Sequence, residues 1–136
     1  MDFIPMYDDT LAGAFKSVPA VETAKAGTFV PQWELYQSGV SSWYGDPNRK
    51  LDRFHGRKTA SGEIFNTWEL TVAHRKLPFG TKIRITNTST QDTVIATVTD
   101  RGPYHKGRIL DMSYATMRAI NGSGLTNVKI EILKGD

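Results

Sequence analysis

The stretch "KIRITNTSTQDTVIATVTD", residues 82–100, decides the fold. Ile83 and Ile85 alternate with polar neighbours, which is the period-two pattern of a half-buried strand. "TSTQ" has the composition of a turn, and "DTVIATVTD" predicts the returning strand.

Further along the chain, the same reading favours a small β-barrel. "NVKIEIL" predicts a strand with Val128, Ile130 and Ile132 on one face. One helix is predicted in "SYATMRAI", with Ser113 as its N-cap and its end at the following Asn-Gly pair. Many short strands with one or two short helices are typical of a mainly β fold closed into a barrel.

The composition is that of one soluble globular domain. The chain has 136 residues, of which 39% are hydrophobic and 23% charged. No apolar run approaches the roughly 18 residues that span a bilayer, and the N-terminus lacks the pattern of a signal peptide. Cysteine is absent and the histidines lie far apart, so we expect no disulfide, no metal site and no cofactor.

The net charge of +3 is unevenly distributed, because residues 1–39 carry two lysines against five acidic residues. The basic remainder suggests a polyanionic partner, either nucleic acid or a wall polymer, with an ordinary solvated surface as the alternative. No nucleic-acid recognition motif accompanies the charge, so nucleic-acid binding ranks last.

Residues 1–38 show no sustained period and are predicted to form an extended N-terminal arm, with one short helix around residues 9–15. Their aromatic content is unusual for a disordered tail, so we expect the arm to dock on a partner chain or on its own domain. Residues 39–136 would form the barrel domain.

Two ionisable side chains follow apolar strand faces. The face of residues 94–98 ends in Asp100, and Leu70 and Val72 share a face with His74. A carboxyl group half-buried against apolar residues resists ionisation, as a general acid near neutral pH requires. The alternative is that both are rim residues satisfied by backbone donors.

Other candidates lie in the loops. Glu63 stands in "FHGRKTASGEIFN" and could take part in proton chemistry, while Trp43 and Tyr44 in "SSWYG" have flat faces that suit sugar rings. Such residues are also common in solvated loops and in cores. Arg101, in the "RGP" turn, could hold a carboxylate or a substrate anion. Asp111 is expected to be structural, as a backbone acceptor near the helix start.

Five stretches, in order, resemble the RlpA-like (rare lipoprotein A) double-psi β-barrels of bacterial lytic transglycosylases. They are "SSWYG", "FHGRKTASGEIFN", "LTVAHRKLPFGTKIRITN", "VTDRGPYHKGRILDMS" and "VKIEIL", and they cover about residues 40–133. The resemblance implies a six-stranded double-psi β-barrel whose groove binds peptidoglycan, with a preference for strands stripped of stem peptides. It places Glu63, His74 and Asp100 at the catalytic positions. The candidate substrate contacts are Trp43, Tyr44, Arg57, Arg101 and Tyr104.

The chain also departs from the family pattern. "NRKLDR", residues 48–53, lengthens the link after "WYG", and Thr99 stands where the family often has Asn. The lipoprotein signal and the C-terminal wall-binding domain of many members are not found here, which puts self-export and septal targeting in doubt.

The resemblance implies a lytic transglycosylase that acts on the bacterial wall or periplasm and forms 1,6-anhydromuramoyl ends. Asp100 would be the acid and base, Glu63 would tune it or stabilise positive charge, and His74 would orient its carboxyl; Asp100 and Glu63 could exchange roles. The alternative is a non-catalytic glycan-binding or structural barrel in a virion or secretion assembly. Since no signal peptide is found in the sequence, one hypothesis is delivery by a phage tail, with residues 1–38 as the contact to a virion or secretion-machine protein. The alternative is a mature domain whose native signal was replaced by Met1.

Overall fold

The computed structural model describes residues 31–48 and 54–134. The predicted helix around residues 9–15, the first 30 residues of the expected arm and most of the "NRKLDR" insertion lie outside the described residues. The chain divides into a unit Met1–Gln32 and a unit Trp33–Asp136, and the second unit contains every described strand.

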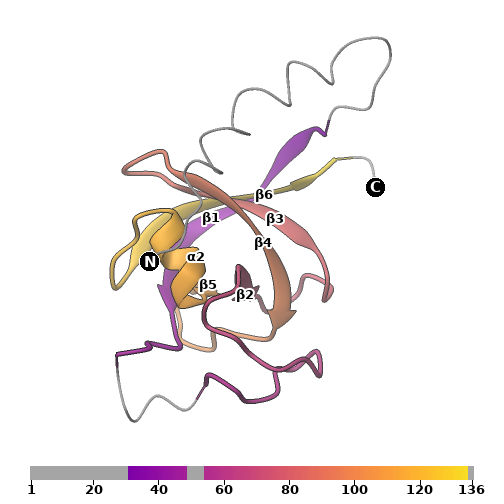
Figure 1. Cartoon of the computed structure of the whole chain (residues 1–136). Helices are drawn as coiled ribbons and strands as arrows, with labels where there is room; N and C mark the ends of the chain where they lie inside the picture. Colours follow the sequence, from indigo (N-terminus) through magenta and orange to yellow (C-terminus); the bar gives the residue numbers. More distant parts are fainter. Residues whose placement is uncertain (1–30, 49–53, 135–136) are drawn as a thin grey trace. The chain divides into compact units, whose positions relative to one another are not determined.

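Six strands close into a barrel in the order β1-β5-β2-β4-β3-β6 (Figure 1). They are β1 (Trp33–Trp43), β2 (Thr71–Ala73), β3 (Lys82–Asn87), β4 (Thr93–Asp100), β5 (Arg108–Met112) and β6 (Thr126–Leu133). The pairs β1–β5 and β2–β4 are parallel and the other four are antiparallel. The predicted six-stranded barrel is therefore confirmed, and β1 begins within the segment expected to form the arm.

The core follows the predicted alternation along the strands. Ile83 and Ile85 on β3 and Val98 on β4 are fully buried, and they pack with buried residues of β5 and β6. The prediction was wrong for Leu70, which lies before β2 and is 42% exposed. Because β2 has only three residues, its alternation does not extend back to Leu70.

The predicted helix is also confirmed. Helix α2 (Tyr114–Ala119) follows Ser113, whose Oγ accepts a hydrogen bond from the N–H of Thr116 at 3.1 Å. Ser113 Oγ also donates to the carbonyl of Glu69 at 2.7 Å, so the cap ties the helix start to the segment before β2.

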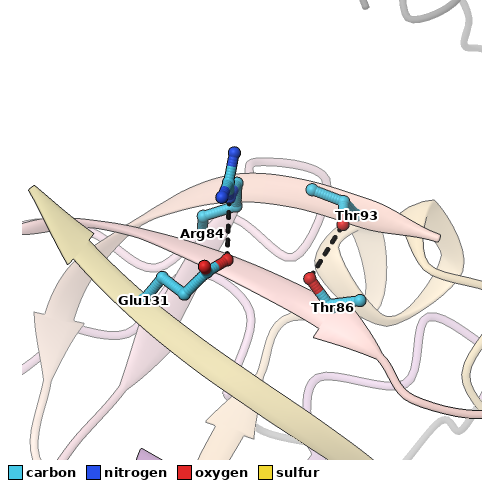
Figure 2. Close-up of polar contacts among 4 residues, drawn as sticks. All are labelled: Arg84, Thr86, Thr93 and Glu131. Carbon is cyan, nitrogen blue, oxygen red and sulfur yellow. Dashed lines mark hydrogen bonds and ion pairs between the residues drawn. The ribbon is translucent and has the colours of Figure 1, made fainter. Parts of the chain in front are cut away.

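On the outer face of β3, polar side chains pair with those of the neighbouring strands (Figure 2). Arg84 Nε donates to Glu131 Oε1 at 2.9 Å, and the hydroxyls of Thr86 and Thr93 lie 2.8 Å apart. In each pair, the two residues lie directly opposite each other in the strand register. The two pairs therefore join β3 to β6 and to β4 through side-chain hydrogen bonds.

Candidate active site

A row of paired residues crosses four strands on the other side of the barrel. Ser42 on β1 pairs with Asp111 on β5, Asp111 pairs with Ala73 on β2, and Ala73 pairs with Asp100 on β4. The neighbours of Asp111 in sequence, Leu110 and Met112, belong to the buried core, so Asp111 points to the outer face. The β2–β4 register shifts between Val72 and Ala73, so Ala73 pairs with Asp100 and not with Thr99. The pairing order therefore places the two acids on either side of Ala73.

Asp100 ends β4 and is held by the loop that contains "TASGE". Its Oδ1 accepts hydrogen bonds from the backbone N–H of Ala60 and of Arg101, each at 2.9 Å. The N–H of Ser61 donates to the carbonyl of Thr99 at 3.2 Å and fixes the same loop on the strand. Because Oδ1 already has two donors, Oδ2 is the oxygen on which a proton can be carried.

A cavity of about 160 Å³ lies beside Asp100. Its other lining residues come from the end of β1 and from the loop before β2 (Tyr44, Phe54, Arg57, Lys58, Thr59 and Phe65). The structure therefore brings the predicted acid together with Tyr44 and Arg57. The mixture of aromatic faces, cations and one acid suits a ligand that is polar and partly apolar, as sugars are.

The ring of Tyr44 is used within the protein. It stacks on Phe65 with centroids 4.7 Å apart and meets the edge of Phe54 at 5.1 Å. Its hydroxyl is buried without a partner at regular hydrogen-bond geometry among residues 31–48 and 54–134. Burial raises the pKa of Tyr44, and the charges of Asp100 and Asp111 together with a hydrogen-bonding interaction with Asp100 raise this pKa further. The phenol therefore stays protonated and is available as a donor.

His74 is buried, and its ring nitrogens have partners other than Asp100. Nδ1 accepts from the N–H groups of Lys76 (3.0 Å) and Leu77 (3.1 Å), so Nε2 carries the proton and donates to Gln37 Oε1 at 2.9 Å. Burial lowers the pKa of His74, and the nearby cations, Arg75 first, lower it further. The predicted hydrogen bond from the ring to the Asp100 carboxyl is thus replaced by a backbone contact, His74 N–H to Asp100 carbonyl, at 3.1 Å.

His74 also lines a second cavity, of about 450 Å³. Its other lining residues are Tyr36, Gln37, Arg75, Lys76 and Ile109. Asp100 is not among them, so the two predicted catalytic residues His74 and Asp100 open onto different hollows in the described part of the chain.

The remaining predicted residues are spread around the rim. Glu63 is exposed, and its loop reaches the acid through the N–H of Ala60. Arg101 donates to the carbonyls of His74 and Leu77 and stacks on a phenylalanine, so it secures the loop after β2 instead of pairing with a carboxylate. Tyr104 is 78% exposed.

Trp43 is partly buried. It packs against the core and lies 5.6 Å from the ring of Tyr114, centroid to centroid. It is thus at least partly a core residue, which was the alternative weighed for it from the sequence.

Asp111 has a different hydrogen-bond partner from the one expected from the sequence. Its Oδ1 accepts a hydrogen bond from Ser42 Oγ, a side chain 69 positions away, and not from the local backbone. The alternation of Leu110, Asp111 and Met112 was the available signal, since it places an acid outward between two core residues.

Two further observations concern metal-ligating clusters and membrane-spanning helices among the described residues. Residues 31–48 and 54–134 contain no cluster of three metal-ligating side chains. Within the same ranges no helix is long and apolar enough to cross a membrane.

Known proteins resemble this chain over most of the barrel. Residues 36–132 match the family model described as lytic transglycolase. A Synechocystis protein named "Probable endolytic peptidoglycan transglycosylase RlpA" is 40% identical over 119 residues, which cover 85% of this chain and 35% of that protein. The "Endolytic peptidoglycan transglycosylase RlpA" of Rickettsia felis is 45% identical over 102 residues, covering 74% and 43%.

The chain therefore spans less than half the length of these curated relatives. Among solved structures, Streptomyces papain inhibitor matches with a TM-score of 0.51 and 17% identity, over 71% of this chain and 92% of that one. At that identity the match concerns the fold alone.

Proposed function

The chain belongs to the lytic transglycolase family, and we propose that its barrel cleaves peptidoglycan glycan strands and leaves 1,6-anhydromuramoyl ends. The observation that carries this proposal is the environment of Asp100. One of its carboxyl oxygens is fixed by two backbone donors, and the residue lines a cavity with Tyr44 and Arg57. The names of the relatives support the substrate and the reaction.

In the proposed reaction Asp100 acts first as acid and then as base. Protonated on Oδ2, it gives its proton to the glycosidic oxygen as the bond from that oxygen to the muramic acid C1 breaks. The muramic acid 6-hydroxyl then attacks C1, forms the new C1–O6 bond and returns its proton to Asp100. The substrate supplies its own nucleophile, so no water positioned by a second carboxylate is required, unlike in an ordinary glycosidase.

The other predicted residues have supporting roles in this proposal. Glu63 would stabilise the positive charge that develops at C1, from the loop that also holds Asp100. His74 would keep the end of β2 in place, through its ring and through its N–H on the Asp100 carbonyl. Arg57, Arg101, Tyr104, Trp43 and Tyr44 would contact or shape the glycan. The reverse assignment, with Glu63 as the acid, is the alternative.

The experiment is mass spectrometry of purified peptidoglycan after incubation with wild type, Asp100→Asn and Glu63→Gln. Intact and amidase-stripped strands would be compared, and Glu69→Gln would serve as a control for loss of an exposed carboxylate. Anhydromuramoyl products from wild type and Glu69→Gln but not from Asp100→Asn are expected. Products from Asp100→Asn but not from Glu63→Gln would assign the acid to Glu63.

A non-catalytic glycan-binding module is the second candidate. The observation in its favour is that two backbone N–H groups satisfy Asp100 Oδ1, as they would in a purely structural acid. Glycan binding without anhydromuramoyl products from any strand type would favour this candidate.

Delivery is a separate part of the proposal. The aromatic residues of residues 1–38 favour docking on a protein partner, and a virion or secretion assembly would bring the barrel to the wall. Cryo-electron microscopy showing residues 1–38 packed on another virion chain would support this route, and an arm folded only on its own barrel would contradict it.

A further inference from the structure

Tyr44 directly follows the last residue of β1 and lies two positions after Ser42. The N–H of Tyr44 donates to the carbonyl of Met112 at 2.9 Å, so pairing with β5 continues past the last residue of β1. Asp111, the β5 neighbour of Met112, accepts its hydrogen bond from Ser42 Oγ. Tyr44 is therefore held along the strand edge that carries Asp111.

On the other side of Asp111, only Ala73 separates it from Asp100 in the register. Adjacent strands are about 4.8 Å apart, so the backbones carrying the two acids are roughly 10 Å apart. The methyl group of Ala73 leaves the space between them unfilled by any larger side chain of its own strand. The Tyr44 phenol lines the same cavity as Asp100, and its buried hydroxyl lacks a regular partner among the described residues.

We propose that Asp111, fixed by Ser42, is a positioning residue of this pocket, and that Asp111 and Asp100 share the Tyr44 phenol as one coupled unit. The proposal rests on the proposed function, because it assigns the second acid that acts on Asp100. That acid is Asp111 of the barrel wall, whereas the exposed Glu63 was expected from the sequence.

The roles of the three groups follow from which of them can donate and which can accept a hydrogen bond. Tyr44 has one proton to donate, and two carboxylates lie near enough to raise the pKa of its phenol. When Asp100 has given its proton to the leaving group, the Tyr44 hydroxyl donates to the new carboxylate. When Asp100 regains its proton, Asp111 remains an anionic acceptor for the hydroxyl. Tyr44 keeps its own proton throughout.

The charge of Asp111 also opposes ionisation of the Tyr44 phenol. The other charged groups that line the cavity with Asp100 are Arg57 and Lys58 of the covering loop. Arg101 and His74 contact Asp100 through their backbone N–H groups. Asp111→Asn therefore removes an anionic acceptor for the Tyr44 hydroxyl and leaves the charged groups that line the cavity in place.

The test compares kcat/KM against pH on amidase-stripped glycan strands for wild type, Asp111→Asn, Tyr44→Phe, the double variant and Glu69→Gln. We expect Asp111→Asn to reduce kcat/KM about tenfold at the wild-type optimum, the loss of one charge-assisted interaction. The loss should appear in kcat with little change in KM, because Asp111 does not line the cavity. In the Tyr44→Phe background the same change should have much less effect. A wild-type kcat for Asp111→Asn, or additive losses in the double variant, would overturn the proposal.

A second measurement separates this proposal from the proposed function. If wild type forms no anhydromuramoyl product, the proposed function fails, and the unit is tested in substrate-free protein by denaturant unfolding of wild type, the two single variants and the double variant. Non-additive changes in the free energy of unfolding support the unit, and additive changes overturn it. Glu69→Gln should leave both measurements at the wild-type values.

Discussion

The two outer faces of the barrel handle polar side chains in opposite ways. On β3 and its neighbours, Arg84 meets Glu131 and Thr86 meets Thr93, so each donor has an acceptor directly opposite (Figure 2). Across β1, β5, β2 and β4, the pairing order places two acids on either side of an alanine, next to a shift in the β2–β4 register. In the first arrangement, the complete face, the polar side chains pair with one another without a ligand. The second arrangement, the incomplete face, has two like charges, a cavity and a buried phenol. We propose that the incomplete face is the one that carries the reaction.

The largest predicted effect separates activity from stability on these two faces. Asp100→Asn should reduce transglycosylase turnover by roughly a thousandfold, the range for loss of a general acid, while the thermal midpoint stays near that of wild type. Glu131→Gln removes a carboxylate from the complete face and should leave turnover unchanged. Initial rates of anhydromuramoyl release and thermal melts check both. Equal loss of turnover in the two variants would remove the functional distinction between the faces.

The second prediction concerns the packing that supports the incomplete face. Gly45 has φ +81°, and a Cβ there would lie 2.6 Å from Thr67 Oγ1 and 2.7 Å from the Phe65 ring, on which Tyr44 stacks. Gly45→Ala should therefore lower the free energy of unfolding by about 2–4 kcal/mol, from backbone strain and overpacking together.

Gly80→Ala is the matched control, because Gly80 has φ +91° and a Cβ added there would meet nothing within 4 Å. Gly80→Ala should lower the free energy of unfolding by about 1 kcal/mol, from backbone strain alone. Denaturant unfolding of both variants gives the difference. Equal losses of unfolding free energy in the two variants would mean that the loop carrying Phe65 moves to accommodate the added methyl group. That loop would then not hold Tyr44 in place.

The third prediction uses the buried His74, which lines the cavity of about 450 Å³. Burial and nearby cations lower the pKa of His74 in the folded protein, so the unfolded state binds its proton more readily. The stability held by neutral His74 is complete above its ordinary pKa of 6.5 and is lost as pH falls below that value. His74→Gln should cost about 1–3 kcal/mol at pH 8, from the broken hydrogen bonds, and should flatten this dependence.

Unfolding free energies measured between pH 5 and pH 8 check this prediction, with His105→Gln as the exposed control. An unchanged slope in His74→Gln would show that another group titrates in this window.

The sequence predicted the parts of this molecule that are determined by residues close together in the chain. The alternation of Ile83 and Ile85 predicted β3, and Ser113 predicted the helix start, because strand faces and caps are set by neighbouring residues. The parallel pairing that places Ser42 beside Asp111 joins residues 69 positions apart, and no local period records it. For the same reason the contacts that His74 and Arg101 make within the protein, in loops after strands, could not be predicted from local order.

The smallest predicted effect tests whether the complete face is only structural. Arg84→Met should lower the free energy of unfolding by about 0.5 kcal/mol at neutral pH, because the pair with Glu131 is partly exposed to solvent. The hydrogen bond from Arg84 lowers the pKa of Glu131, so this contribution is complete above its ordinary value of 4.5 and disappears as pH falls through the lowered value. Unfolding curves of wild type and Arg84→Met should therefore converge in acid, while turnover at neutral pH stays the same in both. A loss of turnover in Arg84→Met would show that the paired face also supports the reaction, and the contrast between the two faces would no longer hold.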